Sequence, residues 1–164
     1  MAVLIMIRGN SGSGKSSTAK QLQKKIGSRM LLIPQDTVRR EMLMVHDGPD
    51  NEAIGLLTAL LEYGSTHCEY VVLEGILRAD WYQPVFEAAA AFFAGRIFAY
   101  YYDISFEETV RRHQSKEHAA FGEAQMRSWW REKDLAGIIP EKIFGDDITS
   151  EEAVAEILRD VGIG

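Results

Sequence analysis

The chain has little of what disulfide-bonded, membrane-spanning and nucleic-acid-binding proteins need. Cys68 is the only cysteine among the 164 residues, so neither an intramolecular disulfide nor a cysteine metal cage can form. No apolar run approaches the ~20 residues that cross a bilayer. The apolar opening, residues 2–7, has no charged leader or cleavage site of a signal peptide. We therefore expect a cytoplasmic protein with no membrane partner.

Positive charge is also scarce. The formal net charge of −6 gives no surface-wide attraction for phosphate backbones, so a nucleic-acid partner is not expected. The 46% apolar and 26% charged residues are ordinary globular composition. The length suits one domain over residues 1–164. Oligomeric state is not readable from these features.

Short apolar segments alternate with stretches of helical periodicity along the chain. The expected strands are 3–8, 30–33, 70–73, 96–102 and 143–148. The expected helices are 15–26, 37–45, 51–67, 81–93, 106–113, 123–135 and 150–161, the last starting at Ser150. Strands separated by helices of this length predict an α/β, three-layer fold, with a five-stranded, mostly parallel sheet covered by helices on both faces.

A glycine-rich loop follows the first strand and matches the Walker A pattern of P-loop proteins. Its glycines let backbone N–H groups approach phosphate oxygens, and the next helix presents its positive end. We expect Lys15 to be a solvent-facing charge that meets the β- and γ-phosphates, and Ser16 to bind Mg²⁺. A dinucleotide loop has another glycine spacing. The sequence thus predicts ATP and Mg²⁺ as cofactors, bound by Gly9, Asn10, Ser11, Gly12, Ser13, Gly14, Lys15, Ser16 and Ser17.

Asp36 follows the second strand, at the sheet edge where ligands of open α/β proteins collect. Arg39 is three residues further on and would share a helix face with it, with Arg40 adjacent. One interpretation makes Asp36 the base or positioner of a substrate hydroxyl. The other makes it only the N-cap of the next helix, with Arg39 as its surface partner.

With these residues in place, the chain resembles the small P-loop kinases, which include chloramphenicol phosphotransferase, gluconate kinase, zeta toxins and phage polynucleotide kinase. The resemblance spans nearly the whole chain and implies an adenylate-kinase-like fold with a small lid. It also implies that Asp36 is the catalytic base. In the polynucleotide kinases, an arginine at the position of Arg39 helps hold the phosphate end.

Further site candidates follow the third strand and the fourth helical region. Glu74 stands where P-loop proteins usually carry an acid, and it either reaches Mg²⁺ through water and contacts substrate or is a satisfied buried acid. Arg78 lies just beyond. The resemblance places a lid at about residues 113–125, with Arg112 and Lys116 on the phosphates. The alternative is a solvated basic helix end.

The segment with Trp129 and Trp130 resembles part of the same kinases. Two adjacent tryptophans cannot share a helix face, so we expect one in the core and the other over a pocket. Arg127 and Arg131, four residues apart, would share a face and either reach phosphates or pair with surface acids. Acceptor contacts are expected within residues 46–61 and from Trp81 and Tyr82. None of His46, His67, His113 and His118 has metal-ligand spacing.

These features predict an ATP-dependent kinase that transfers the γ-phosphate to a hydroxyl of a small molecule, a metabolite or an antibiotic. Asp36, Lys15, Arg39 and Arg112 are the catalytic candidates, and Arg40, Glu74 and Arg78 are further substrate contacts. A polynucleotide 5′-hydroxyl kinase and a toxin-like or nucleotide-switch P-loop ATPase remain as alternatives. The acceptor is not identifiable from the sequence.

Overall fold

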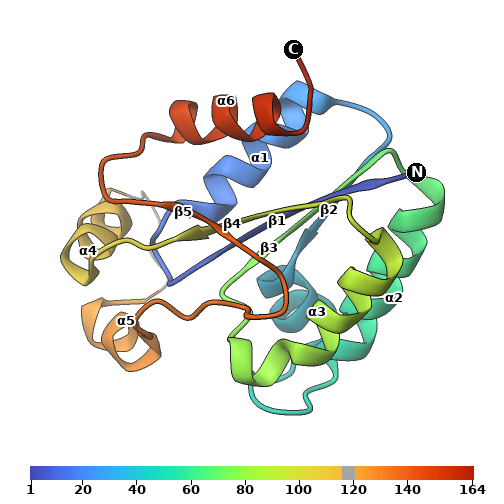
Figure 1. Cartoon of the computed structure of the whole chain (residues 1–164). Helices are drawn as coiled ribbons and strands as arrows, with labels where there is room; N and C mark the ends of the chain where they lie inside the picture. The colour runs from blue at the N-terminus through green and yellow to red at the C-terminus, as the bar shows by residue number, and fades with distance from the viewer. Residues whose placement is uncertain (116–120) are drawn as a thin grey trace.

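A parallel sheet runs through the centre of the protein in the computed structural model, which describes residues 1–115 and 121–164 (Figure 1). Its strand order is β2-β3-β1-β4-β5, and every neighbouring pair is parallel. The predicted α/β fold class is confirmed, and the sheet is wholly rather than mostly parallel. The strands are β1 (Val3–Gly9), β2 (Met30–Pro34), β3 (Tyr70–Gly75), β4 (Ile97–Tyr102) and β5 (Lys142–Phe144).

Helices cover both faces of the sheet (Figure 1). On one face α1 (Lys15–Ile26) packs with α6 (Ser150–Asp160), and on the other α2 (Ala53–His67) packs with α3 (Ala79–Phe93). Each face has its own apolar cluster, because β1, buried along its whole length, sends side chains alternately to both. Three shorter elements complete the fold: the π-helix η1 (Thr37–Leu43), α4 (Phe106–Gln114) and α5 (Glu123–Trp129).

Several helix ends differ from the sequence prediction. The helix expected over residues 123–135 stops at Trp129, and Trp130 has extended geometry with ψ 134°. The segment expected as a helix at 37–45 is a π-helix, a geometry frequent at functional sites. The last helix does begin at Ser150, as predicted, and its cap is Thr149, whose side chain accepts a hydrogen bond from the Glu152 backbone N–H. Within the described residues, no helix is long and apolar enough to cross a membrane.

Candidate active site

The glycine-rich loop precedes α1 and packs closely against α4. Gly12 has φ +81°, and a Cβ added there would lie 2.7 Å from the carbonyl oxygen of Thr109. Gly14 has φ +106° at the position just before the helix. A residue with a side chain would be strained at either position, so both glycines are required by this backbone. The loop therefore has the geometry that presents successive N–H groups to an anion.

Lys15 is buried in this loop with 7% of its surface exposed, so the expectation of a solvent-facing lysine is wrong. Its Nζ donates to the carbonyl oxygen of Asn10, in the same loop, at 2.9 Å. Ser13 is fully buried, and its Oγ has no hydrogen-bond partner among the described residues. This Oγ lies close to Gly9 and is an exception to the usual pairing of buried polar groups. The loop thus fits a nucleoside triphosphate.

Ser16 and Glu74 meet at the carboxyl end of β3. The Ser16 Oγ donates to Glu74 Oε1 at 3.0 Å. Burial raises the pKa of Glu74, while the nearby Lys15 charge and the Ser16 hydroxyl act in the opposite direction. A hydroxyl and a carboxylate beside a phosphate cradle suit a hard cation such as Mg²⁺. In the described part of the chain no three His, Cys, Asp or Glu residues gather as a metal cluster, so phosphate oxygens and water would supply the remaining ligands.

Asp36 precedes η1 and is not its cap, because its side chain makes no capping hydrogen bond. The side-chain cap of the second interpretation is therefore absent, whereas the surface pair with Arg39 that it also expected is present. Asp36 Oδ1 instead accepts from Arg39 Nη2 at 3.3 Å and lies 3.6 Å from Arg40 Nε. The side chain of Asp36 is 58% exposed, so both pairs are loose and accessible to a ligand. The predicted proximity of Asp36 and Arg39 is present.

A cavity of about 710 Å³ joins the glycine-rich loop to Asp36. Trp129 and Trp130 both line it, so the expectation of one core tryptophan is wrong. Tyr82 is fully buried behind it, where its hydroxyl donates to Asp47 Oδ1 at 2.6 Å. The lining residues are Ser11, Asp36, Arg39, Arg40, Met44, Val45, His46, Asp47, Ile76, Arg78, Trp81, Phe121, Ser128, Trp129, Trp130 and Arg131.

Arg78 and Arg131 lie on one wall of this cavity. Arg78 stacks its guanidinium 4.1 Å from the centre of the Trp81 ring and binds Asp80 at 2.7 Å. Arg131 also reaches Asp80, at 3.5 Å. Arg127 does not join them, because α5 ends before Arg131 and the Arg127 guanidinium lies over Phe106.

Arg112 lies against the nucleotide loop. Its Nη1 donates to the carbonyl oxygen of Ser13 at 2.6 Å, and its Nη2 donates to the carbonyl oxygen of Asp146 at 2.9 Å. Glu108 accepts from its Nε at 3.0 Å. Arg112 thus borders the nucleotide side of the site. Lys116 and much of the predicted lid lie outside the described residues, so the lid stays a prediction.

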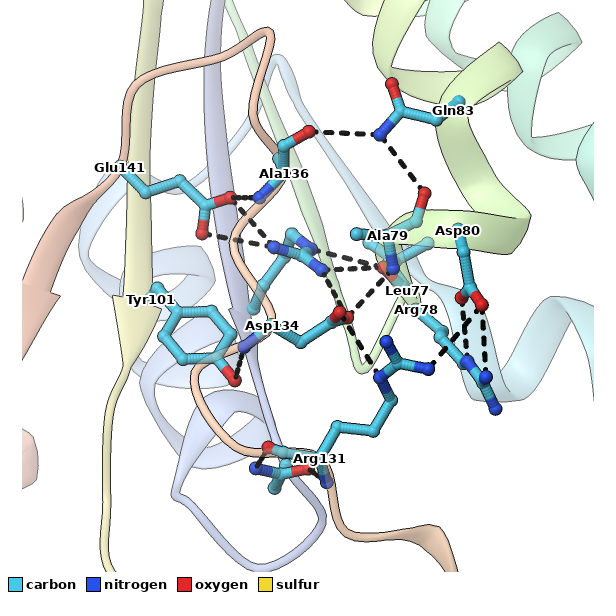
Figure 2. A network of polar contacts seen from close by, with 12 residues as sticks. Leu77, Arg78, Ala79, Asp80, Gln83, Tyr101, Arg131, Asp134, Ala136 and Glu141 are labelled. Atoms are coloured by element: carbon cyan, nitrogen blue, oxygen red, sulfur yellow. Dashed lines mark hydrogen bonds and ion pairs between the residues drawn. The ribbon is translucent and has the colours of Figure 1, made fainter.

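Sequence reasoning missed the buried charge network beneath the site, which Figure 2 shows. Arg8, taken only as the end of a strand, is 0% exposed. It donates to Glu141 Oε1 at 2.8 Å, to Asp134 Oδ2 at 3.2 Å and to the carbonyl oxygen of Leu77 at 2.8 Å. The available signal was an arginine inside an otherwise apolar strand, since a buried charge needs partners.

Asn10 makes a second connection that the sequence did not reveal. Its side-chain amide donates to the carbonyl oxygen of Arg131 at 2.6 Å and accepts from the Arg131 backbone N–H at 2.9 Å. The oxygen and the nitrogen of the Asn10 amide thus both bond to the backbone of Arg131, which lies in the segment that follows α5. This pairing explains why the helix predicted to continue to residue 135 ends early: the backbone of Arg131 is bonded to the nucleotide loop instead of to a helical turn.

A family model described as an AAA domain matches residues 4–134. Among solved structures, a gluconokinase from Sinorhizobium meliloti has a TM-score of 0.69 at 20% identity, covering 98% of this chain and 91% of its own. An APS kinase from Mycobacterium tuberculosis, solved with AMPPNP and APS, has a TM-score of 0.68 at 18% identity, with 99% and 98% covered. A tunicamycin resistance protein from Deinococcus radiodurans has a TM-score of 0.67 at 13% identity, with 100% and 98% covered.

No curated protein matches the chain in sequence. At these low identities the structural neighbours establish the fold, and they are consistent with the small P-loop kinase resemblance.

Proposed function

The chain belongs to the AAA domain family, and we propose that it is an ATP-dependent kinase that phosphorylates a hydroxyl group of a small molecule. The observation that carries this proposal is the single cavity that runs from Ser11 of the nucleotide loop to the accessible carboxylate of Asp36. A phosphate bound in the loop and a hydroxyl bound at Asp36 would face each other across that cavity. Positioning of this kind supplies much of the rate of phosphoryl transfer.

In this mechanism the oxygen of the acceptor hydroxyl bonds to the γ-phosphorus of ATP, and Asp36 accepts the proton of that hydroxyl. The bond between the γ-phosphorus and the bridging oxygen of ADP breaks, and ADP leaves. Lys15 moves its ammonium from the Asn10 carbonyl oxygen to the phosphates and balances their charge. Arg39, within reach of Asp36, orients the carboxylate. Mg²⁺, when bound near Ser16 and Glu74, would neutralise phosphate charge.

The remaining catalytic candidate, Arg112, has a narrower role in this proposal. Its guanidinium already contacts the backbone of Ser13, and Ile148 and Asp146 hold it from the other side. We assign it to holding the nucleotide and the loop, and to adding positive charge at the cradle.

A screen of hydroxyl compounds for ADP release tests this function, with Asp36→Asn as the decisive variant. Asparagine keeps the size of the side chain but cannot accept the proton, so turnover with the true acceptor should fall by about 10²–10⁴-fold. Because Asp36 caps no helix, the melting temperature should hardly change. ATP affinity should also persist. Near-normal turnover in Asp36→Asn would contradict the assignment.

A polynucleotide 5′-hydroxyl acceptor is the second candidate, favoured by the Asp36–Arg39 pair. It predicts oligonucleotide binding that weakens steeply with salt. ADP release that needs no acceptor, and that Asp36→Asn leaves unchanged, would instead favour a nucleotide-switch ATPase.

A further inference from the structure

We propose that the cavity beside Asp36 selects acceptors that carry a flat aromatic ring and an anionic group in addition to the hydroxyl. This inference rests on the proposed function, because it names the substrate class of the same site.

The first observation is where the tryptophans gather. The chain contains three, Trp81, Trp129 and Trp130, and all of them line this one cavity. Trp129 keeps 38% of its surface exposed. Its ring is held edge-on by Phe121, with centroids 4.9 Å apart. Tryptophan buries the largest apolar surface of any side chain, so the exposed part of the Trp129 indole beside Asp36 indicates a surface that a ligand ring covers.

The second observation is the kind of cation present. Among the residues that the structure describes, the lining contains four arginines and no lysine, in a chain whose net charge is −6. Arginine differs from lysine in presenting a planar fork of donors that matches a carboxylate, sulfate or phosphate and that also stacks on aromatic rings. Both properties are in use here. Arg78 lies 4.1 Å from the centre of the Trp81 ring, and Arg40 lies 5.8 Å from that of Trp129.

The third observation is how the arginines are already neutralised. Arg39 and Arg40 lie beside Asp36, so they belong to the hydroxyl end of the cavity. Arg78 and Arg131 share the carboxylate of Asp80, which is not a lining residue (Figure 2). Arg131 also pairs with Asp134 at 3.4 Å, but Asp134 forms an ion pair with the buried Arg8 as well. Two guanidiniums thus face the cavity with shared acids beside them, an arrangement that keeps arginines oriented for a ligand anion.

Together these features divide the cavity into three parts. Asp36 receives the hydroxyl, the exposed indole of Trp129 receives a ring, and Arg78 and Arg131 receive the anion. The triphosphate has its own cations in Lys15 and Arg112, which lie in the nucleotide loop and against it.

The test uses four matched alcohols and measures binding to the native protein by ligand-observed NMR in the presence of a non-hydrolysable ATP analogue. They are para-(hydroxymethyl)benzoate, with ring and anion; para-methylbenzyl alcohol, with the ring alone; trans-(hydroxymethyl)cyclohexanecarboxylate, with the anion alone; and cyclohexylmethanol, with neither. We expect the first to bind at least about tenfold more tightly than any other, since one charged hydrogen bond or one stacked ring each contributes that much. Equal binding across the set, or no binding of the first compound, would overturn the inference.

Variants separate the two recognition elements. Arg78→Gln and Arg131→Gln should remove the advantage of the carboxylate, and Trp129→Leu should remove the advantage of the ring. Matched controls are Arg29→Gln, which alters an exposed arginine paired with Glu69, and Tyr63→Leu, which alters an exposed aromatic residue of α2. If Arg131→Gln fails to fold, Arg78→Gln alone tests whether the arginines recognise the carboxylate. Loss of ATP-analogue affinity in the arginine variants, with the carboxylate advantage retained, would assign them to the nucleotide and overturn the inference.

The outcome is distinguishable from failure of the kinase proposal, because binding needs no transfer. The expected preferences without ADP release from any hydroxyl compound would sustain the inference and contradict the kinase. ADP release with acceptors that have neither ring nor anion, at undiminished efficiency, would do the reverse.

Discussion

The nucleotide side and the acceptor side of the cavity are built differently. On the nucleotide side, Asn10 and Lys15 are buried and bonded to a distant partner or within the loop, and Arg8 beneath the site is buried and bonded in the same way. On the acceptor side, Asp36 is half-exposed and its ion pairs lie at 3.3 and 3.6 Å on a π-helix. In the proposed kinase, this difference would give a buried, firmly bonded site for ATP and a more exposed wall for the acceptor.

Breaking the buried network should have the largest effect. Arg8→Met removes the cation between Glu141 and Asp134 and leaves two buried carboxylates without it. Breaking a buried pair in this way costs about 3–5 kcal/mol, to be measured as the free energy of unfolding in urea. The control is Arg29→Met, whose exposed pair with Glu69 should contribute no more than about 1 kcal/mol. Similar losses in both variants would mean that burial does not distinguish the two regions.

Removing the cradle cation should affect chemistry rather than stability. Lys15→Ala should lower phosphoryl transfer by at least about 10²–10³-fold for every acceptor, because the charge acts on the shared phosphates. ATP affinity should fall as well, in contrast with Asp36→Asn. Steady-state kinetics with two unlike acceptors checks this prediction. A loss confined to one acceptor would place Lys15 in acceptor recognition instead of in the cradle.

Cutting the link between the two sides should have a smaller, mixed effect. Asn10→Ala leaves the backbone N–H and C=O of Arg131 without the amide that pairs with both. We expect about 1–3 kcal/mol less stability and a raised KM for the acceptor, because the Asn10 side chain positions Arg131. The KM for ATP should change little, because Asn10 contributes to the nucleotide loop through its backbone, which alanine keeps. Gln21→Ala is the control, since its amide joins α1 to Ser150 away from the cavity. An unchanged acceptor KM in Asn10→Ala would show that acceptor binding does not depend on the hydrogen bonds between Asn10 and Arg131.

The same contrast explains how much the sequence could predict. The Walker A loop, the first helix at 15–26 and the first four strands follow from local patterns of glycine and apolar residues, and they form close to the predicted bounds. The fifth strand, Lys142–Phe144, is shorter than the predicted 143–148, because the chain turns after Phe144. The Asp36–Arg39 pair follows from a spacing of three residues. The early end of α5 could not be predicted from a local pattern, because it depends on the bond between Arg131 and Asn10, which lies 121 residues away in the sequence. The partners of Arg8 are equally distant in sequence.

Glu74 lies between the two sides, and its titration provides the smallest and most specific test. Burial, the largest influence, raises its pKa above 4.5, and the nearby Asp36 charge acts in the same direction. A carboxyl group with a raised pKa in the folded state binds more protons there than in the unfolded chain, so its contribution to stability falls as pH rises above 4.5. A neutral glutamine has no such cost.

We therefore expect Glu74→Gln to be more stable than the native protein at pH 7.5, on the order of 1.4 kcal/mol for each pKa unit, and this advantage to disappear at pH 4. Urea unfolding at the two pH values measures the difference. Glu69→Gln, at an exposed position, is the control and should change stability by less than about 1 kcal/mol at either pH. Adding ATP and Mg²⁺ at pH 7.5 should stabilise the native protein more than Glu74→Gln, since the carboxylate that burial opposes is the form that helps to hold the cation. A native protein more stable than Glu74→Gln at pH 7.5 without nucleotide would mean that Lys15 and Ser16 fully offset the burial of this carboxylate.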